Sequence, residues 1–107
     1  MTIIIEGEVL EFDWYEGNYE KNWAKHKVSA QEAEDAFVDE QKIVFLDIKH
    51  LGVEERFFLL AKTQSGRLLA VAYTRRNDKV RVISARDASN KEVRIYEETT
   101  HSAEVQK

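Results

Sequence analysis

Alternation of apolar and polar residues in the middle of the chain predicts a β-sheet. Four runs rich in β-branched and aromatic residues follow one another after residue 41: KIVFLDI, ERFFLLAK, RLLAVAYTRR and KVRVISAR. The segments that separate them, KHLGVE, TQSG and ND, are short and polar, as hairpin connections are. We therefore expect four antiparallel strands in a meander, each with one face apolar enough to cover a core.

Helical spacing occurs on both sides of this meander. Before it, the segment EGNYEKNWAKHK places aromatic residues one turn apart, and Ser29 with Glu32 has the spacing of a capping box at the start of a second helix. After it, Ser89 and Glu92 repeat the capping-box spacing. These signals predict two helices before the four strands and one helix after them.

A further strand is predicted ahead of the first helix. The segment VLEFDW, which begins at residue 9, alternates apolar and acidic residues. The order strand, helix, helix, four strands, helix predicts an α+β domain, with an antiparallel sheet of four to five strands and all three helices gathered on one face. A chain of 107 residues holds one such domain, which we place at residues 10–98, between an N-terminal extension at 1–9 and a flexible tail at 99–107.

Composition excludes several kinds of site. The chain has no cysteine, so it has no disulfide, thiol nucleophile or thiolate metal site. The histidines His26, His50 and His101 lack metal-ligand spacing, the glycines form no phosphate-binding loop, and no Gly-x-Ser-x-Gly motif is present. No run approaches the roughly 18 apolar residues of a membrane span. We expect a soluble, cytoplasmic protein that uses no metal or other cofactor and contacts no membrane.

Charge is unevenly distributed along the chain. Residues 1–55 carry fourteen Asp or Glu against five Lys, a net charge of −9, whereas residues 56–96 carry ten Lys or Arg against three acids, a net charge of +7. A block of one sign focuses a local potential even when the whole chain has a net charge of −4. The basic block is therefore either an anion-binding surface or an ordinary solvated face of the sheet.

Arginine, lysine, tyrosine and one histidine remain as candidates for chemistry. Cleavage of RNA without a metal needs a base for the 2′-hydroxyl proton, cations for the phosphorane and an acid for the leaving oxygen. The arginine fork matches phosphate oxygens, and the arginines near strand ends are expected to converge beside His26 as a phosphodiester pocket: Arg56, Arg76, Arg81 and Arg86. The alternatives are surface ion pairs for the arginines, a helix cap for His26, and core packing for Tyr73 and Tyr96.

The motifs, in this order, resemble the BrnT family of bacterial type II toxin–antitoxin systems. The likeness runs from Leu10 to Glu97 and is carried by FDW, KHKVS, EAEDAF, EERFFLLAKTQSGRLLAVAYTRR, VRVISAR and KEVRIYEE. It implies a compact RelE-like fold and a metal-independent endoribonuclease that inhibits translation by cleaving RNA. It also implies neutralisation by a BrnA-type antitoxin through which alone the toxin contacts DNA, in a homodimer or a toxin–antitoxin heterotetramer.

The resemblance also implies a set of functional residues. The catalytic set at matching positions is Lys25, His26, Arg56, Tyr73, Arg76, Arg81 and Arg86. RNA contacts are expected from further basic and aromatic side chains: Arg67, Arg75, Lys79, Arg94 and Tyr96. Lys27 departs from the family, which usually has a glycine there. Residues 1–9 extend the family pattern, either as an added edge strand or as an alternative start. These departures and the acidic total leave open a degenerate, non-catalytic toxin that serves only as antitoxin partner and co-repressor.

Overall fold

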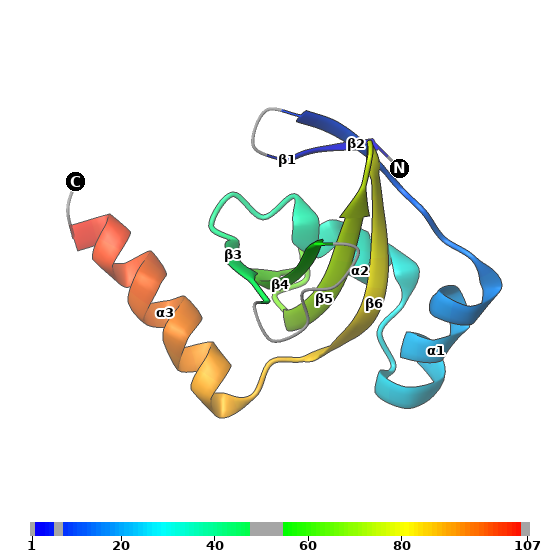
Figure 1. The fold of residues 1–107 in the computed structure, drawn as a ribbon. Helices are drawn as coiled ribbons and strands as arrows, with labels where there is room; N and C mark the ends of the chain where they lie inside the picture. Colours follow the sequence, from blue (N-terminus) through cyan, green and yellow to red (C-terminus); the bar gives the residue numbers. More distant parts are fainter. Residues whose placement is uncertain (1, 6–7, 48–54, 106–107) are drawn as a thin grey trace.

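The computed structural model describes residues 2–5, 8–47 and 55–105, which form six strands and three helices (Figure 1). In chain order these are β1 (Thr2–Ile5), β2 (Glu8–Phe12), α1 (Glu16–His26), α2 (Ala30–Phe37), β3 (Ile43–Leu46), β4 (Glu55–Lys62), β5 (Leu68–Arg76), β6 (Lys79–Asp87) and α3 (Asn90–Val105). The connection predicted at 49–54 lies outside the described residues, and so does His50. None of the described helices is long and apolar enough to cross a membrane.

The strands form a single mixed sheet in the order β1-β2-β6-β5-β4-β3. The predicted meander is confirmed, because β3 to β6 pair as consecutive antiparallel neighbours. The α+β class is likewise confirmed. The expectation of a purely antiparallel sheet of four to five strands is corrected at one place, since β2 runs parallel to β6, with Glu11 opposite Lys79 and Phe12 opposite Val80.

The N-terminal segment adds a strand at the edge of this sheet. Thr2 pairs with Glu11 and Ile5 with Glu8, so β1 and β2 form an antiparallel hairpin. The segment expected as an extension therefore contributes β1, which is the sixth strand. At the other end of the chain α3 reaches Val105, well into the segment expected to be a tail, whose flexibility stays a prediction.

The two faces of the sheet are covered by different helices. Alternate side chains of a strand point to opposite faces. Leu59 therefore joins Phe37 of α2 in the larger buried cluster, while Leu60 joins Tyr96 of α3 in a smaller one. Figure 1 shows α3 set apart from α1 and α2. The expectation that all three helices share one face is therefore corrected, because α3 packs on the opposite face from α2.

Both predicted capping boxes are present. The Glu32 backbone N–H donates to Ser29 Oγ at 3.1 Å, and the Ser29 N–H donates to Glu32 Oε1 at 3.1 Å. At the start of α3 the same exchange joins Ser89 and Glu92, at 3.3 Å and 2.8 Å. Each box satisfies backbone donors that a helix start leaves without partners within the helix. The sequence pattern therefore located the starts of α2 and α3.

The turn between α1 and α2 explains why a glycine suits position 27. Lys27 has a φ of 56°, in the left-handed region that L side chains other than glycine rarely enter. Its N–H donates to the Trp23 carbonyl at 3.0 Å, which is the bond that closes a helix with a left-handed C-cap. The next residue, Val28, is fully buried. Lys27 thus adopts the conformation that glycine would adopt with less strain.

Asn22 of α1 anchors this helix to the sheet. Its side chain is 3% exposed, and its Oδ1 accepts a hydrogen bond of 2.9 Å from the Ala85 N–H of β6. β2 pairs with β6 only at Lys79 and Val80, so that backbone group of β6 lies beyond the strand pairing. The Asn22 side-chain amide therefore accepts from a buried backbone N–H that would otherwise have no hydrogen-bond partner.

Candidate functional site

A row of polar side chains crosses three strands on the face that α3 covers only in part. Thr74 of β5 lies opposite Arg56 of β4 on one side and opposite Arg81 of β6 on the other. Residues directly opposite on neighbouring strands point to the same face. Two residues further along, Arg76 lies opposite Lys79 on that face. The sheet register therefore gathers three arginines and a lysine around one threonine.

A surface pocket of about 240 Å³ opens at this row. It is lined by three cationic residues, two carboxylates and two neutral polar residues: Arg76, Lys79, Arg81, Asp13, Asp78, Thr74 and Asn77. The tight β5–β6 turn supplies Asn77, whose φ of 55° is one that asparagine tolerates better than most residues. The pocket thus combines a modest positive charge with several hydrogen-bonding groups, which suits an anion such as a phosphodiester.

Arg81 is oriented by two residues that follow β2. Its Nη2 and Nε donate to the single oxygen Oδ2 of Asp13, at 2.9 Å and 3.3 Å. Its guanidinium carbon lies 5.3 Å from the centre of the Tyr15 ring. The Asp13 N–H donates to the Val80 carbonyl at 2.8 Å, so the parallel pairing of β2 with β6 fixes this approach. Sequence reasoning missed Asp13 and Tyr15, because no local signal indicates a parallel pairing between segments so far apart.

Arg56 forms the β4 end of this row, and one of its donors makes no hydrogen bond to the described residues. Its side chain is 29% exposed, and its Nε is 3.5 Å from Asp47 Oδ2. That Nε is buried and makes no hydrogen bond to any described residue. A buried donor in this state is costly unless something else satisfies it. Arg56 therefore adds a positive charge on this face, and its buried Nε faces Asp47.

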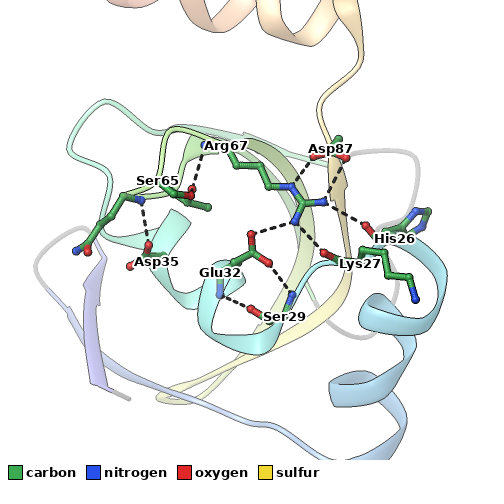
Figure 2. A network of polar contacts seen from close by, with 10 residues as sticks. His26, Lys27, Ser29, Glu32, Asp35, Ser65, Arg67 and Asp87 are labelled. Atoms are coloured by element: carbon green, nitrogen blue, oxygen red, sulfur yellow. Dashed lines mark hydrogen bonds and ion pairs between the residues drawn. The ribbon is translucent and has the colours of Figure 1, made fainter.

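Arg67 is instead the centre of a structural network (Figure 2). It donates to both carboxylate oxygens of Asp87 at 2.7 Å and 3.2 Å, and to Glu32 Oε2 at 3.0 Å. It also donates to the backbone carbonyls of Lys27 at 2.8 Å and His26 at 3.2 Å. The hydrogen bonds to Asp87 raise the pKa of Arg67 and lower that of Asp87. Arg67 therefore ties the end of α1 and the start of α2 to the end of β6.

Arg86 makes a second structural tie, between β6 and the first turn of α3. Its Nη1 donates to Glu92 Oε1 at 2.7 Å and its Nη2 to Glu92 Oε2 at 3.0 Å. The arginine fork holds the pKa of Glu92 at about 2, well below its ordinary value. The guanidinium also lies 5.9 Å from the Phe58 ring centre. For Arg67 and Arg86, the ion-pair interpretation accounts for the geometry.

His26 and Lys25 lie away from the pocket. Both belong to the last turn of α1, and the His26 carbonyl accepts from Arg67. The electrostatic neighbour of His26 is Asp87, which follows Arg81 by six residues in β6, or about 20 Å of strand. The expected convergence of arginines beside His26 therefore does not occur. Arg56, Arg76 and Arg81 gather at one end of the sheet, while His26 lies near the other end.

The two candidate tyrosines are core residues. Tyr73 is 2% exposed and lies between Phe37 and Phe57, with ring-centre distances of 4.9 Å and 5.3 Å. Tyr96 is 4% exposed, and its hydroxyl donates to Asp39 Oδ2 at 2.6 Å. Burial and this carboxylate raise the pKa of Tyr96. Neither ring is placed to stack on a base in this structure, which favours the core-packing alternative for both.

Of the side chains expected to contact RNA, only Lys79 lines the pocket. Arg75 lies on β5 in alternation with Thr74 and so points to the face that carries α2, and Arg94 is exposed on α3. Within the described part of the chain, no group of three His, Asp or Glu residues is arranged to hold a metal ion. The arrangement therefore offers guanidinium, ammonium and carboxylate groups for chemistry on an anion.

Comparison with known proteins supplies the family. No curated protein matches the chain. A family model described as a ribonuclease toxin, BrnT, of type II toxin–antitoxin systems matches residues 14–92. That match covers most of the chain, including Tyr15, Arg56, Arg81 and Lys79. The chain therefore belongs to the BrnT family of ribonuclease toxins of type II toxin–antitoxin systems.

Proposed function

We propose that this chain is a metal-independent endoribonuclease toxin that inhibits translation by cleaving RNA, with the scissile phosphodiester bound in the pocket around Arg81. One observation carries the proposal. In a member of a ribonuclease toxin family, the sheet register places Arg76, Lys79 and Arg81 around a single pocket on an open face.

The chemistry of such a pocket follows from its charges. Attack of the 2′-hydroxyl on phosphorus builds negative charge on the non-bridging oxygens, which guanidinium and ammonium groups stabilise more strongly in the transition state than in the ground state. Asp13 Oδ2 lies 2.9 Å from Arg81 Nη2. A phosphate on Arg81 therefore brings its ribose close to this carboxylate, which we assign as the general base that takes the 2′-hydroxyl proton. As the 2′-oxygen bonds to phosphorus, the bond from phosphorus to the 5′-oxygen breaks and the leaving oxygen takes a proton from water. Arg56 approaches the same face from β4 and supplies a further cation.

A toxin of this kind needs an inhibitor, and we assign that role to a BrnA-type antitoxin. The edge strand β3 exposes Phe45 and Leu46, whose side chains are 41% and 47% exposed. An exposed strand edge flanked by apolar side chains can accept a partner segment as an added strand. We further propose that the toxin acts in the cytoplasm, reaches DNA only through this antitoxin, and assembles as a homodimer or a toxin–antitoxin heterotetramer.

RNA cleavage by purified protein tests the proposal. We expect wild type to cleave mRNA equally with and without EDTA, and Arg81→Ala to cut at a rate about 10²- to 10³-fold lower, as for loss of one charge-stabilising donor. Arg94→Ala is the matched control, because Arg94 is also exposed but lies on α3. RNA left intact by wild type, or cleaved normally by Arg81→Ala, contradicts the proposal. Binding of an antitoxin without growth inhibition would instead indicate the non-catalytic partner and co-repressor.

A further inference from the structure

Tyr15 is an exposed aromatic residue that contacts Arg81. It lies between β2 and α1, immediately beside the pocket, and 52% of it is exposed. Its ring lies against the guanidinium of Arg81, at 5.3 Å from ring centre to guanidinium carbon. Exposed tyrosine rings next to cationic grooves are the usual stacking platforms for unpaired bases. Trp14, its neighbour, differs because its Nε1 donates to Glu34 Oε2 at 2.8 Å and the side chain is half-buried.

Gly17 leaves room for the Tyr15 ring to lie close to the start of α1. A Cβ built on Gly17 would lie 2.9 Å from Tyr15 Cε2 and 3.4 Å from Cδ2. The first distance is shorter than side-chain carbons tolerate, so any other residue at position 17 would push the ring aside. Gly17 lies in the first turn of α1, where alanine or a polar residue would also be compatible with the helix. The close approach of the Tyr15 ring gives a physical reason for the glycine.

We propose that Tyr15 is a base-stacking subsite of the toxin, so that the substrate is single-stranded RNA whose unpaired base stacks on this ring while its backbone enters the pocket at Arg81. This inference rests on the proposed function and specifies its substrate class. A paired base is held within a duplex stack, so the subsite selects against double-stranded RNA. Gly17 is a positioning residue in this arrangement, since it acts only through the ring.

Binding of an uncleavable RNA tests the subsite separately from catalysis. The probe is a fluorescent, single-stranded 2′-O-methyl oligoribonucleotide, which lacks the attacking hydroxyl, together with the same oligonucleotide carrying abasic positions. We expect Tyr15→Ala to raise the dissociation constant for the intact oligonucleotide about ten-fold, as for loss of one stacked base. The Tyr15→Phe variant should bind as wild type does, because it keeps the ring. Wild type and Tyr15→Ala should bind the abasic probe equally.

The chain contains a matched control and a second variant. Trp23 is 53% exposed and also has a cation over its ring, Lys27 Nζ at 5.4 Å, but lies on α1 outside the pocket. Trp23→Ala should leave binding unchanged. Gly17→Ala, which keeps Tyr15, should weaken binding of the intact probe more than of the abasic one.

The subsite is overturned if Tyr15→Ala binds the intact probe as wild type does, or if it loses as much affinity for the abasic probe as for the intact one. Wild type that fails to bind single-stranded RNA also overturns it. Wild type that binds with the expected dependence on Tyr15 but never cleaves RNA overturns the proposed function and leaves the subsite standing. If Tyr15→Ala cleaves RNA fully and binds the probe as tightly as wild type, the subsite is overturned and the proposed function stands.

Discussion

The two ends of β6 use arginine in opposite ways. At its first residues, which we call the pocket end (Lys79–Arg81), Arg81 is 43% exposed, touches one carboxylate oxygen and faces an open pocket. We call its last residues the anchored end (Ala85–Asp87). There Arg86 donates hydrogen bonds to both carboxylate oxygens of Glu92, and Asp87 accepts two hydrogen bonds from Arg67. The two arginines are about equally exposed, 43% for Arg81 and 39% for Arg86. They differ in their partners, because Arg81 lines the pocket and bonds one oxygen of Asp13, whereas Arg86 bonds both oxygens of Glu92.

This difference shows what a block of basic residues can mean. Arg67, Arg81 and Arg86 belong to the same +7 segment of sequence and were all candidates for RNA contact or catalysis. The carboxylates that distinguish them are supplied by other elements: Glu32 by α2, Glu92 by α3 and Asp13 by the segment after β2. Function at the pocket end and stability at the anchored end are therefore expected to separate under mutation.

Arg67→Ala is expected to have the largest effect on stability. It removes five side-chain hydrogen bonds, leaves two backbone carbonyls of the α1–α2 turn without their donor, and should lower the free energy of unfolding by about 2 to 4 kcal/mol. Arg81→Ala removes two hydrogen bonds to a single carboxylate oxygen at a 43% exposed side chain and should cost less than about 1 kcal/mol. Urea denaturation of both variants checks the contrast. Equal decreases in the free energy of unfolding for the two variants would contradict the difference proposed between the pocket end and the anchored end.

Asn22→Ala comes next. The substitution removes the only side-chain acceptor that the described residues offer to the Ala85 N–H, so a buried donor loses its partner. We expect a loss of about 1 to 3 kcal/mol in the free energy of unfolding. Hydrogen exchange at Ala85 should accelerate more than at the other residues of β6, because the substitution removes the acceptor of the Ala85 N–H itself. An unchanged hydrogen-exchange rate at the Ala85 N–H would show that α1 protects β6 from exchange without the hydrogen bond to the Asn22 side chain.

Glu92→Gln should weaken the interaction between Arg86 and residue 92 at the anchored end. We expect the free energy of unfolding to fall by about 1.5 kcal/mol at neutral pH. The folded protein holds the pKa of Glu92 at about 2, below its ordinary value of 4.5. Its ion pair therefore stabilises the fold fully above pH 4.5, and this contribution disappears as the pH falls from 4.5 toward 2. Unfolding free energies across that interval should fall more steeply for wild type than for Glu92→Gln or Arg86→Gln. Parallel curves for the three proteins would contradict the assignment.

The smallest expected effect concerns position 27, in the turn that Arg67 holds. Lys27→Gly should be more stable than Lys27→Ala by about 0.5 to 1 kcal/mol, because only glycine enters the left-handed region without strain. Alanine is the matched reference, since both variants lose the contact of Lys27 Nζ with the Trp23 ring. Thermal unfolding of the pair measures the difference. A more stable alanine variant would mean that the strain at φ 56° is relieved in some other way.

The local features of the fold could be predicted from neighbouring residues. Alternating apolar residues identified the strands of the meander, and Ser29 with Glu32 and Ser89 with Glu92 identified two helix starts. Each of these signals involves residues only a few positions apart, and within one helix or strand their separation along the chain fixes their relative positions in space. The membership of the BrnT family was also readable from the order of the motifs and is confirmed by the family model.

The tertiary structure alone decided the site. The parallel pairing of β2 with β6 brings Asp13 and Tyr15 to Arg81, and the placement of α3 brings Glu92 to Arg86. No short motif encodes either event, because the pairing of distant segments depends on which arrangement buries the most apolar surface for the whole chain. The sequence therefore determined the elements, the family and the presence of a basic block. Only the assembled sheet determined which of its arginines line the candidate pocket and which are tied to carboxylates of the helices.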